Sequence, residues 1–489
     1  MYSCMNENLT QRSINSFLWK TAQSICSLGS TFIIQIVLAR ILNPTDFGIV
    51  AITTVFMTLA NTIVETSFSS SVIQRKELDP KLLSSIFYAN SILSIIVYSF
   101  LFLVAPVIAH FYDEAILTLV LRVQGLRIVA SSLCSIQDSL LTRAMKFKTL
   151  FICELIGALV QAGVGLVMAY TGFGVWAIVF SALSGYLSSG IGKIIASKWK
   201  PSLFYSYSLV KDALSFSSKI LIIRFTRKLF YNIRTLTIGK VYTTDTLGYF
   251  NKGFQFPSTA MTIVDGSLTS VAFTSLSKLQ NDKQALICAL RNYVRIMMYL
   301  CTPMMIGMVI VAEPLVKVLL TDKWLACVPY LQIVCFTQLL APLNVKTTAF
   351  EALGESSISM RLHVSSIVLS IILLFISIPY PAWVMVFSGF VSNLLLQIAI
   401  GFVCKKRMNY LYSDQLKDVF IGLIPTLGMV VIVFFCSYIS CNVLLKLLLE
   451  IVLGIFAYVG FSALSKNPIL YQMISYYKRI RLTRRNDVS

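Results

Sequence analysis

Long apolar stretches recur along the whole chain, and short polar connections separate them. A helix needs about 20 mostly apolar residues to cross the hydrocarbon core of a bilayer, and fourteen stretches of this kind can be recognised. They are residues 17–38, 47–70, 85–109, 116–141, 150–170, 174–196, 209–238, 247–274, 290–312, 325–350, 358–379, 381–403, 418–439 and 443–464. The pattern therefore predicts an all-α polytopic membrane protein with about 14 transmembrane helices and no separate soluble domain.

The composition supports this prediction and excludes other classes of protein. Of the 489 residues, 57% are hydrophobic and 13% are charged, whereas roughly 25% are charged in an average soluble domain. This leaves too little polar surface for a soluble enzyme. The 11 cysteines form no Cys-x-x-Cys pair and there are 2 histidines, so we expect no metal site and no cofactor. The chain has no P-loop or hydrolase motif, so no catalytic residue is expected either.

The charge of the chain indicates its topology. The 41 Lys and Arg residues and the 21 Asp and Glu residues give a net charge of +20. In a soluble protein this excess would suggest a nucleic-acid partner. If the N-terminus is cytoplasmic, however, 27 basic residues fall in cytoplasmic segments and 5 in outer segments. Because cytoplasmic loops are enriched in Lys and Arg, we predict that both termini are cytoplasmic and that no nucleic acid is bound.

An internal repeat divides the chain. Residues 39–50 align with residues 239–250 at an offset of 200, so that Arg40 matches Lys240 and Gly48 matches Gly248. Each segment ends one long apolar span and opens the next. The repeat predicts two pseudo-symmetric six-helix lobes related by an axis along the membrane normal, followed by two further helices. The expected boundaries are 1–205, 206–405, and 406–489 for the extra helices and a basic cytoplasmic tail.

Four blocks of sequence resemble a known family. They are LARILNPTDFGIVAI at 38–52, SSSVIQRKEL at 69–78, LLTRAMKFKTL at 140–150 and TIGKVYTTDTLGYFNKGFQFP at 237–257. The chain resembles the polysaccharide-exporter branch of the MOP superfamily, which contains Wzx-type lipid-linked oligosaccharide flippases, and in particular its colanic-acid-exporter type. The resemblance covers nearly the whole chain. One departure is Arg234-Thr235, which stands where the family commonly has Asp-Asn.

The resemblance implies a specific function. It implies a transporter that moves a polyprenyl-diphosphate-linked oligosaccharide from the cytoplasmic to the outer leaflet of the bacterial inner membrane by alternating access. The exported glycan would serve the biosynthesis of lipopolysaccharide, O-antigen or exopolysaccharide. The expected partners are the lipid-linked glycan, membrane lipids, and the glycan polymerase and glycosyltransferases of the same pathway. We expect the protein itself to be a monomer.

The seventh predicted span contains charges that are unusual for a membrane helix. Arg224, Arg227, Tyr231 and Arg234 stand at i, i+3, i+7 and i+10 and share one helical face, which Lys219 precedes. A central Arg costs roughly 2.5–3.5 kcal/mol on insertion scales, so this face should meet water, an acidic partner or an anionic ligand. Arg offers paired donors to phosphate oxygens, which favours a diphosphate head group. The alternatives are ion pairs with neighbouring helices and, for Lys219 and Arg224, snorkelling to the membrane interface.

Three other basic residues are candidates for contact with the head group. Arg40 lies at the outer end of the first span, where it could equally cap the helix and anchor it at the interface. Arg122 and Arg127 lie about one turn apart in the fourth span. They are candidates for the wall of the transport cavity.

Three acidic residues within the spans are candidates for coupling transport to an ion. They are Glu65, Glu154 and Asp265. A buried carboxylate can take up a proton or Na⁺, and it can also pair permanently with Arg or Lys. Static pairing is the more common outcome, so both interpretations stay open.

Two other functions compete with the flippase. A membrane glycan polymerase or glycosyltransferase would need a long outer loop or a soluble domain to hold its acceptor, and the outer connections are short. A MATE-like small-molecule exporter would favour an acidic cavity, because its substrates are usually cations. The basic residues in and at the ends of the spans argue against it.

Overall fold

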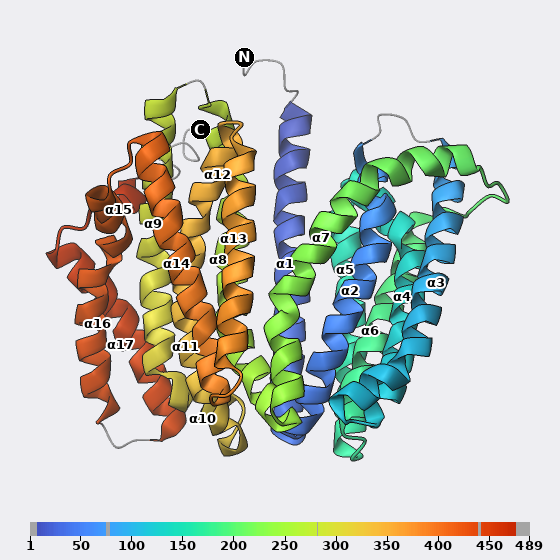
Figure 1. Cartoon of the computed structure of the whole chain (residues 1–489), viewed down its shortest axis with the longest axis horizontal. Coiled ribbons are helices and arrows are strands. Elements are labelled where there is room, and N and C mark those ends of the chain that lie inside the picture. Colours follow the sequence, from blue (N-terminus) through green and yellow to red (C-terminus); the bar gives the residue numbers. More distant parts are fainter. Residues whose placement is uncertain (1–6, 75–78, 281, 439–441, 476–489) are drawn as a thin grey trace. The chain divides into compact units, whose positions relative to one another are not determined.

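The computed structural model describes residues 7–74, 79–280, 282–438 and 442–475. Within the helices, the side chains of residues 7–18, 65–74, 208–209, 212–220, 223 and 265–275 lie outside this description. All regular elements of the described chain are helices, as the sequence predicted (Figure 1). By their internal contacts they form two compact units, residues 1–248 (unit 1) and 249–489 (unit 2), and each unit is described by itself.

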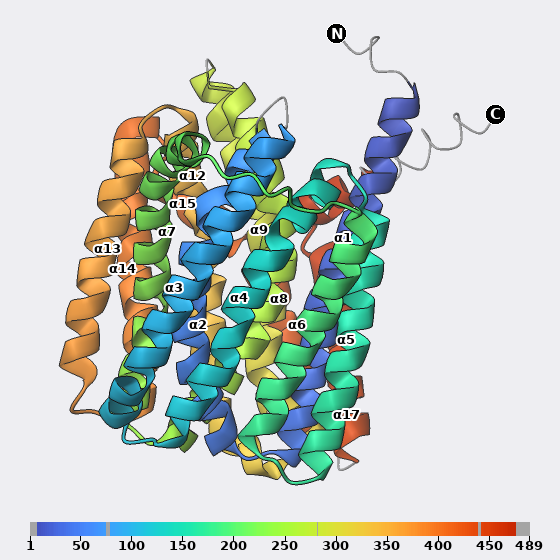
Figure 2. The same cartoon turned by 90° about the vertical axis from the view of Figure 1, so that its right-hand side faces the viewer.

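Unit 1 is built from the first seven helices and the start of the eighth. They are α1 (Glu7–Ile41), α2 (Pro44–Gln74), α3 (Pro80–Tyr112), α4 (Ile116–Arg143), α5 (Phe147–Tyr170), α6 (Val175–Ser197), α7 (Tyr207–Val241) and α8 (Thr244–Lys278). Figure 2 looks onto this unit and shows α3, α4 and α6 side by side. The N-terminal turn of α7 packs on the start of α3, where Val210 joins Leu82, Leu83 and Ile86 in a buried apolar cluster.

Unit 2 contains the rest of α8 and the later helices. They are α9 (Lys283–Ile310), α10 (Ala312–Leu319), α11 (Val328–Leu339), α12 (Val345–Ala352), α13 (Ser356–Ser377), α14 (Ala382–Met408), α15 (Tyr412–Val419), α16 (Leu423–Ser437) and α17 (Val443–Leu464), with the short 3₁₀ helices η1 (Asp322–Cys327), η2 (Ala341–Asn344) and η3 (Phe420–Gly422). One apolar core joins α9, α12 and α14 around Leu290, Phe350 and Ile400. A second core joins α9, α16 and α17 around Tyr299, Met429 and Tyr458.

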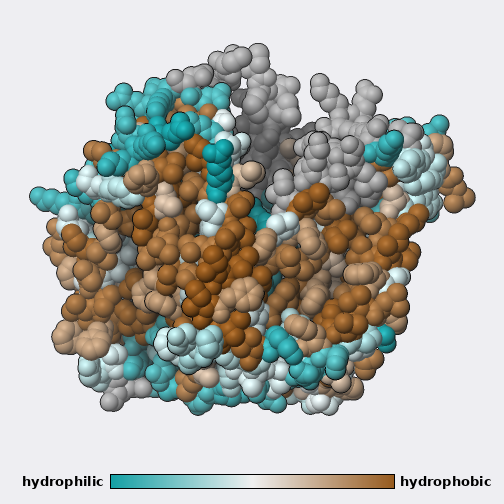
Figure 3. Space-filling model, viewed as in Figure 1, coloured by the Kyte–Doolittle hydropathy of each residue, from teal (hydrophilic) through white to brown (hydrophobic). Residues whose placement is uncertain are grey.

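Each of the fourteen predicted spans coincides with a helical segment. In the described chain, twelve segments are long and apolar enough to cross a membrane. The helices α7 and α8 are not among them, but at 35 residues each they are long enough, so the structure is consistent with fourteen spans. In Figure 3, apolar residues cover the middle of the helices and hydrophilic residues gather at their ends. The chain is therefore a multi-pass, all-α membrane protein, as predicted.

The compact units do not divide the chain where the predicted lobes do. The sequence predicts a lobe boundary at 205/206, whereas the contacts divide the chain after Gly248, because α7 packs on α2 and α3 within unit 1. Compactness and internal homology are different properties, however. The lobe boundaries at 205/206 and 405/406 therefore stay a prediction.

Prolines interrupt several of the helices. A proline has no N–H to donate to the carbonyl four residues earlier, and in a membrane each freed carbonyl needs another donor. Pro106 frees the carbonyl of Phe102, which accepts from Arg122 Nε at 3.4 Å. In α9, Pro303 frees the carbonyl of Tyr299, which accepts a 2.6 Å bond from the Tyr458 hydroxyl.

The same rule explains a break in the thirteenth span. Pro425 frees the carbonyl of Ile421, at the point where η3 separates α15 from α16. The side-chain amide of Asn467 donates to this carbonyl at 2.7 Å. Polar side chains from elsewhere in the same unit therefore stabilise the broken helices.

Candidate functional site

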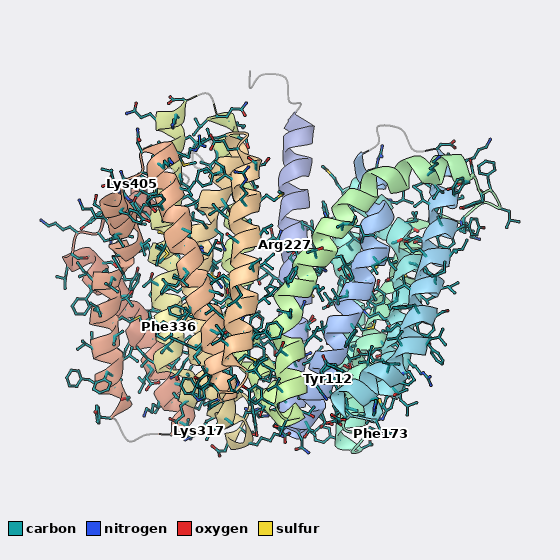
Figure 4. The ribbon with its side chains drawn as sticks, in the orientation of Figure 1. Tyr112, Phe173, Arg227, Lys317, Phe336 and Lys405 are labelled. Carbon is teal, nitrogen blue, oxygen red and sulfur yellow. The ribbon has the colours of Figure 1, made fainter. Side chains whose placement is uncertain are left out.

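The arginines of α7 lie on a face that is largely exposed. Arg224, Arg227 and Tyr231 are exposed, and Arg234 is partly buried. Arg227 lies about midway along α7 (Figure 4). Neither Arg224 nor Arg227 forms an ion pair with any residue that the structure describes. The side chain of Lys219 lies outside the described residues. Two guanidinium groups one turn apart on an exposed face can bind one anion through several charge-assisted hydrogen bonds.

A second polar site lies inside unit 1. It is a cavity of about 510 Å³ between α1, α2, α4, α5 and α6. Four amide side chains line it, those of Gln35, Asn61, Gln124 and Gln161. The space for Gln161 exists because Gly185 of α6 has no side chain: a Cβ there would lie 2.7 Å from the Cβ of Gln161.

The charged residues of this cavity are arranged in two groups. Lys193 of α6 pairs with Asp138 of α4 at 3.0 Å and with Glu154 of α5 at 2.8 Å, and its own side chain is 13% exposed. On α4, the Arg127 guanidinium lies over the ring of Tyr186, 4.7 Å from its centroid. Of the predicted site residues, the structure thus brings Arg127 and Glu154 to one cavity.

The remaining predicted residues lie elsewhere. Arg40 is exposed in the last turn of α1. Arg122 packs against α3, with its guanidinium 4.0 Å from the centre of the Phe102 ring, and is not part of the cavity lining. The side chains of Glu65 and Asp265 lie outside the described residues. Roles for all of these residues in transport stay predictions.

A polar pair lies at the C-terminal end of α7, in one of the two repeat segments. Lys240, the counterpart of Arg40, donates to Asp113 at 2.9 Å and lies over the Phe111 ring. The hydrogen bond and the positive charge of Lys240 lower the pKa of the Asp113 carboxyl. This pairing favours a structural role for Lys240 at the end of α7.

Unit 2 contains a buried ionic network that the sequence did not predict. Asp418 is fully buried and accepts hydrogen bonds from Arg291 Nε at 2.8 Å, from Arg295 and from the Tyr410 hydroxyl at 2.7 Å. Burial, followed by the hydrogen bond to Asp418, raises the pKa of Tyr410. The network ties α9 to α15. Its carboxylate is fully occupied by protein donors, which favours a structural role.

Sequence reasoning also missed much of the cavity in unit 1. Lys193, Gln124 and Gln161 line this cavity and are not among the predicted site residues. A periodic signal was present on α5, where Glu154, Gly157 and Gln161 stand at i, i+3 and i+7 and so share a face. No group of three or more His, Cys, Asp or Glu side chains that could hold a metal ion occurs among the described residues.

Comparison with known proteins gives the family. Residues 37–329 match the model of a family described as polysaccharide biosynthesis protein. The teichuronic acid biosynthesis protein TuaB of Bacillus subtilis is 22% identical over 84% of this chain and 86% of its own length. The lipopolysaccharide biosynthesis protein WzxC of Escherichia coli is 22% identical over 68% of each chain.

A solved structure gives the fold. The lipid II flippase MurJ, in an inward closed conformation, matches 94% of this chain and 100% of its own with a TM-score of 0.71 and 18% identity. The family model covers more than half of the chain, and the MurJ fold agrees with the predicted helical transporter architecture. The chain therefore belongs to the polysaccharide biosynthesis protein family, as its resemblance to the polysaccharide exporters of the MOP superfamily implied.

Proposed function

We propose that this protein is a flippase that moves a polyprenyl-diphosphate-linked oligosaccharide from the cytoplasmic to the outer leaflet of the bacterial inner membrane. The single observation that supports it most directly is the exposed pair Arg224 and Arg227. The pair lies in α7, which the sequence predicts to be a membrane helix, and has no carboxylate partner among the described residues. Such charges are costly in lipid. A mobile anionic ligand compensates this cost and leaves the arginines available for the next cycle.

The relatives support the same chemistry. TuaB and WzxC are named for the biosynthesis of teichuronic acid and lipopolysaccharide, and MurJ is a flippase for lipid II. Surface polysaccharide biosynthesis and a flippase fold together favour a lipid-linked glycan over a soluble solute. In this proposal the head group binds to Arg224, Arg227 and Arg234, the polyprenyl tail stays in lipid, and the site is exposed to each side in turn.

The membrane potential can drive the export. An inside-negative potential favours outward movement of an anion by about 2.3 kcal/mol per charge per 100 mV. A diphosphate with two charges would gain about twice that. Coupling to H⁺ or Na⁺ through Glu65, Glu154 or Asp265 is a further candidate source of energy. With both termini cytoplasmic, a fluorescent protein fused to the C-terminus would resist protease added from the outer side.

Substitution of single arginines tests the proposal. In cells whose surface glycan depends on this chain, Arg224→Gln, Arg227→Gln and Arg234→Gln should each lower surface glycan and raise the pool of lipid-linked glycan, at equal membrane levels. Lys211→Gln is the matched control, because Lys211 is an exposed base in the first turns of the same helix. Full export by all three arginine variants would rule out the head-group site.

A multidrug exporter of the MATE type is the competing transporter. It would move cations, for which an exposed arginine face is repulsive. Deletion of the chain should therefore leave resistance to cationic dyes unchanged while it abolishes surface glycan. The opposite result would favour the exporter.

A further inference from the structure

The polar cavity of unit 1 has no part in the proposed binding of the diphosphate. It nevertheless shows the features of a binding site. Ser189 is 5% exposed, and its hydroxyl oxygen and the carbonyl oxygen of the Asn61 amide are buried without a hydrogen-bond partner among the described residues. Buried polar atoms nearly always have a partner, and leaving one unpaired costs about 1–3 kcal/mol. Water or the polar groups of a ligand must therefore supply the hydrogen-bond partners that these two atoms lack.

The charges of the cavity argue against a cation as the ligand. Glu154 and Asp138 are both paired with Lys193, so a metal ion would have to displace an ammonium group that already satisfies them. A diphosphate is also a poor fit, because the Lys193 ammonium is occupied by these two carboxylates. Apart from Arg127, the remaining polar lining is uncharged. Its amides both donate and accept, and the hydroxyls of Ser30, Thr31 and Thr54, which already donate to backbone carbonyls, can still accept. Besides the four amides, the lining includes the hydroxyls of Ser27, Ser30, Thr31, Thr54 and Thr58.

A saccharide has the complementary chemistry. Each sugar hydroxyl donates one hydrogen bond and accepts others, as an amide side chain also does. Arg127, whose guanidinium lies over the Tyr186 ring, adds several N–H donors in one planar group. The volume of about 510 Å³ lies within the range of about 300–1,000 Å³ that is typical of small-molecule sites, and it is many times that of one water molecule.

We propose that this cavity binds sugar residues of the lipid-linked glycan, with Asn61, Gln124, Gln161 and Ser189 as hydrogen-bonding residues. The inference rests on the proposed function and assigns the two parts of the substrate to two different sites. The arginines of α7 hold the diphosphate, which all substrates of this kind share, and the cavity of unit 1 selects the sugars. A site built to hydrogen-bond hydroxyls discriminates strongly, because a wrong sugar leaves buried polar groups unpaired.

Photocrosslinking at two adjacent residues of α5 tests this proposal. Ala158 lines the cavity, whereas its neighbour Leu159 is 66% exposed on the outside of the helix. Benzoylphenylalanine is placed at 158 or at 159 in the full-length protein, in cells that make the glycan, and membranes are irradiated. The probe is the cell's own lipid-linked glycan, detected on the purified protein by periodate oxidation and biotin hydrazide. Mild acid then cleaves the bond between sugar and diphosphate.

The acid step separates the possible attachments. We expect a biotin signal at 158 that survives mild acid, because the crosslink is to sugar, and no such signal at 159. A signal at 158 that acid removes would place lipid or phosphate in the cavity and overturn the inference. An export-competent 158 variant without signal would show that the cavity holds water only, and would overturn it too. If instead deletion of the chain leaves surface glycan unchanged, the proposed function itself fails.

Leucine substitutions keep the proposal testable if benzoylphenylalanine at 158 prevents folding. Asn61→Leu and Gln161→Leu should each lower glycan export about tenfold at equal membrane levels, the loss expected when one polar contact is removed and its partner stays buried. Gln332→Leu is the matched control, since Gln332 bonds the carbonyl of Val309 within unit 2. Export within twofold of wild type for both cavity variants would overturn the sugar site.

Discussion

Gly48 and Gly248 make reciprocal contacts at the helix ends of the internal repeat. A Cβ added to Gly48 would overlap the carbonyl oxygen of Thr244, and a Cβ added to Gly248 would overlap the carbonyl oxygen of Pro44. Between these two contacts, the Thr45 hydroxyl donates to Asp245 at 2.7 Å. Contacts in which residue i meets j and j meets i are what a two-fold axis produces. The offset of 200 residues thus corresponds to a local two-fold axis.

This contact predicts that neither glycine tolerates a side chain. Gly48→Ala and Gly248→Ala should each lower stability by about 1–3 kcal/mol, the usual cost of overpacking, because the obstructing atoms belong to the backbone. The effect would be measured as a lower midpoint of thermal unfolding of the purified protein in detergent. Both substitutions widen the same interface. The double variant should therefore lose less stability than the sum of the losses in the two single variants.

A glycine elsewhere in a helix gives the control. Gly163 of α5 has open space where a Cβ would lie, so Gly163→Ala should be neutral or stabilising by about 0.5–1 kcal/mol through its helix propensity. If Gly48→Ala behaved like Gly163→Ala, the close approach of the two helix ends would be refuted.

The predictable part of this structure follows from local pattern. The lengths of the apolar windows predicted fourteen spans, each of which coincides with a helical segment, and twelve of these segments are long and apolar enough to cross a membrane. Such windows are predictable because they consist of consecutive residues. The shared face of Arg224, Arg227 and Tyr231 was readable for the same reason, since helical periodicity alone determines it.

The less predictable part depends on which helices become neighbours. Lys193 and Glu154 are separated by 39 residues in the sequence. Nothing in the sequence of either helix predicts that these two side chains lie opposite each other where α5 and α6 pack together. Arg122 is recognisable in the sequence as a charge within a span, but the sequence does not reveal that its guanidinium bonds the carbonyl that Pro106 frees on α3. Such pairs are set by tertiary packing, which one sequence does not reveal.

The pairing of Arg122 with Pro106 can be tested by a double-mutant cycle. Arg122→Leu should lower stability by about 1–2 kcal/mol, because it leaves the carbonyl of Phe102 without its donor. Pro106→Ala restores an N–H at the position that normally bonds this carbonyl. In the Pro106→Ala background, Arg122→Leu should therefore lower stability clearly less than it does in the wild type. Thermal unfolding of the four proteins measures the coupling, and equal costs in both backgrounds would contradict it.

The buried carboxylate of unit 2 predicts a large effect. Asp418→Asn keeps the shape of the side chain but removes the charge that Arg291 and Arg295 share, so stability should fall by about 2–3 kcal/mol. Asp414 is the control: its side chain is 31% exposed and lies 3.3 Å from Arg291. Asp414→Asn should cost less than about 1 kcal/mol, as for other partly solvated pairs. Similar unfolding midpoints for the two variants would argue against Asp418 as the centre of the network.

The pair of Asp113 and Lys240 predicts a pH-dependent effect of small size. Lys240 lowers the pKa of the Asp113 carboxyl in the folded protein, so the pair stabilises the fold above the unfolded pKa of about 3.9. This contribution is lost as the pH falls through the lower, folded pKa. Asp113→Asn is a suitable variant, because Asp113 has a left-handed backbone with φ of 58° and Asn adopts this conformation readily. The unfolding midpoint of the variant should lie slightly below that of the wild type at pH 7. The gap should close in acid, as the pH falls through the lowered pKa of Asp113 in the folded protein, and it should shrink in 1 M salt. A gap that persisted in acid would assign the effect to the side-chain shape and not to the ion pair.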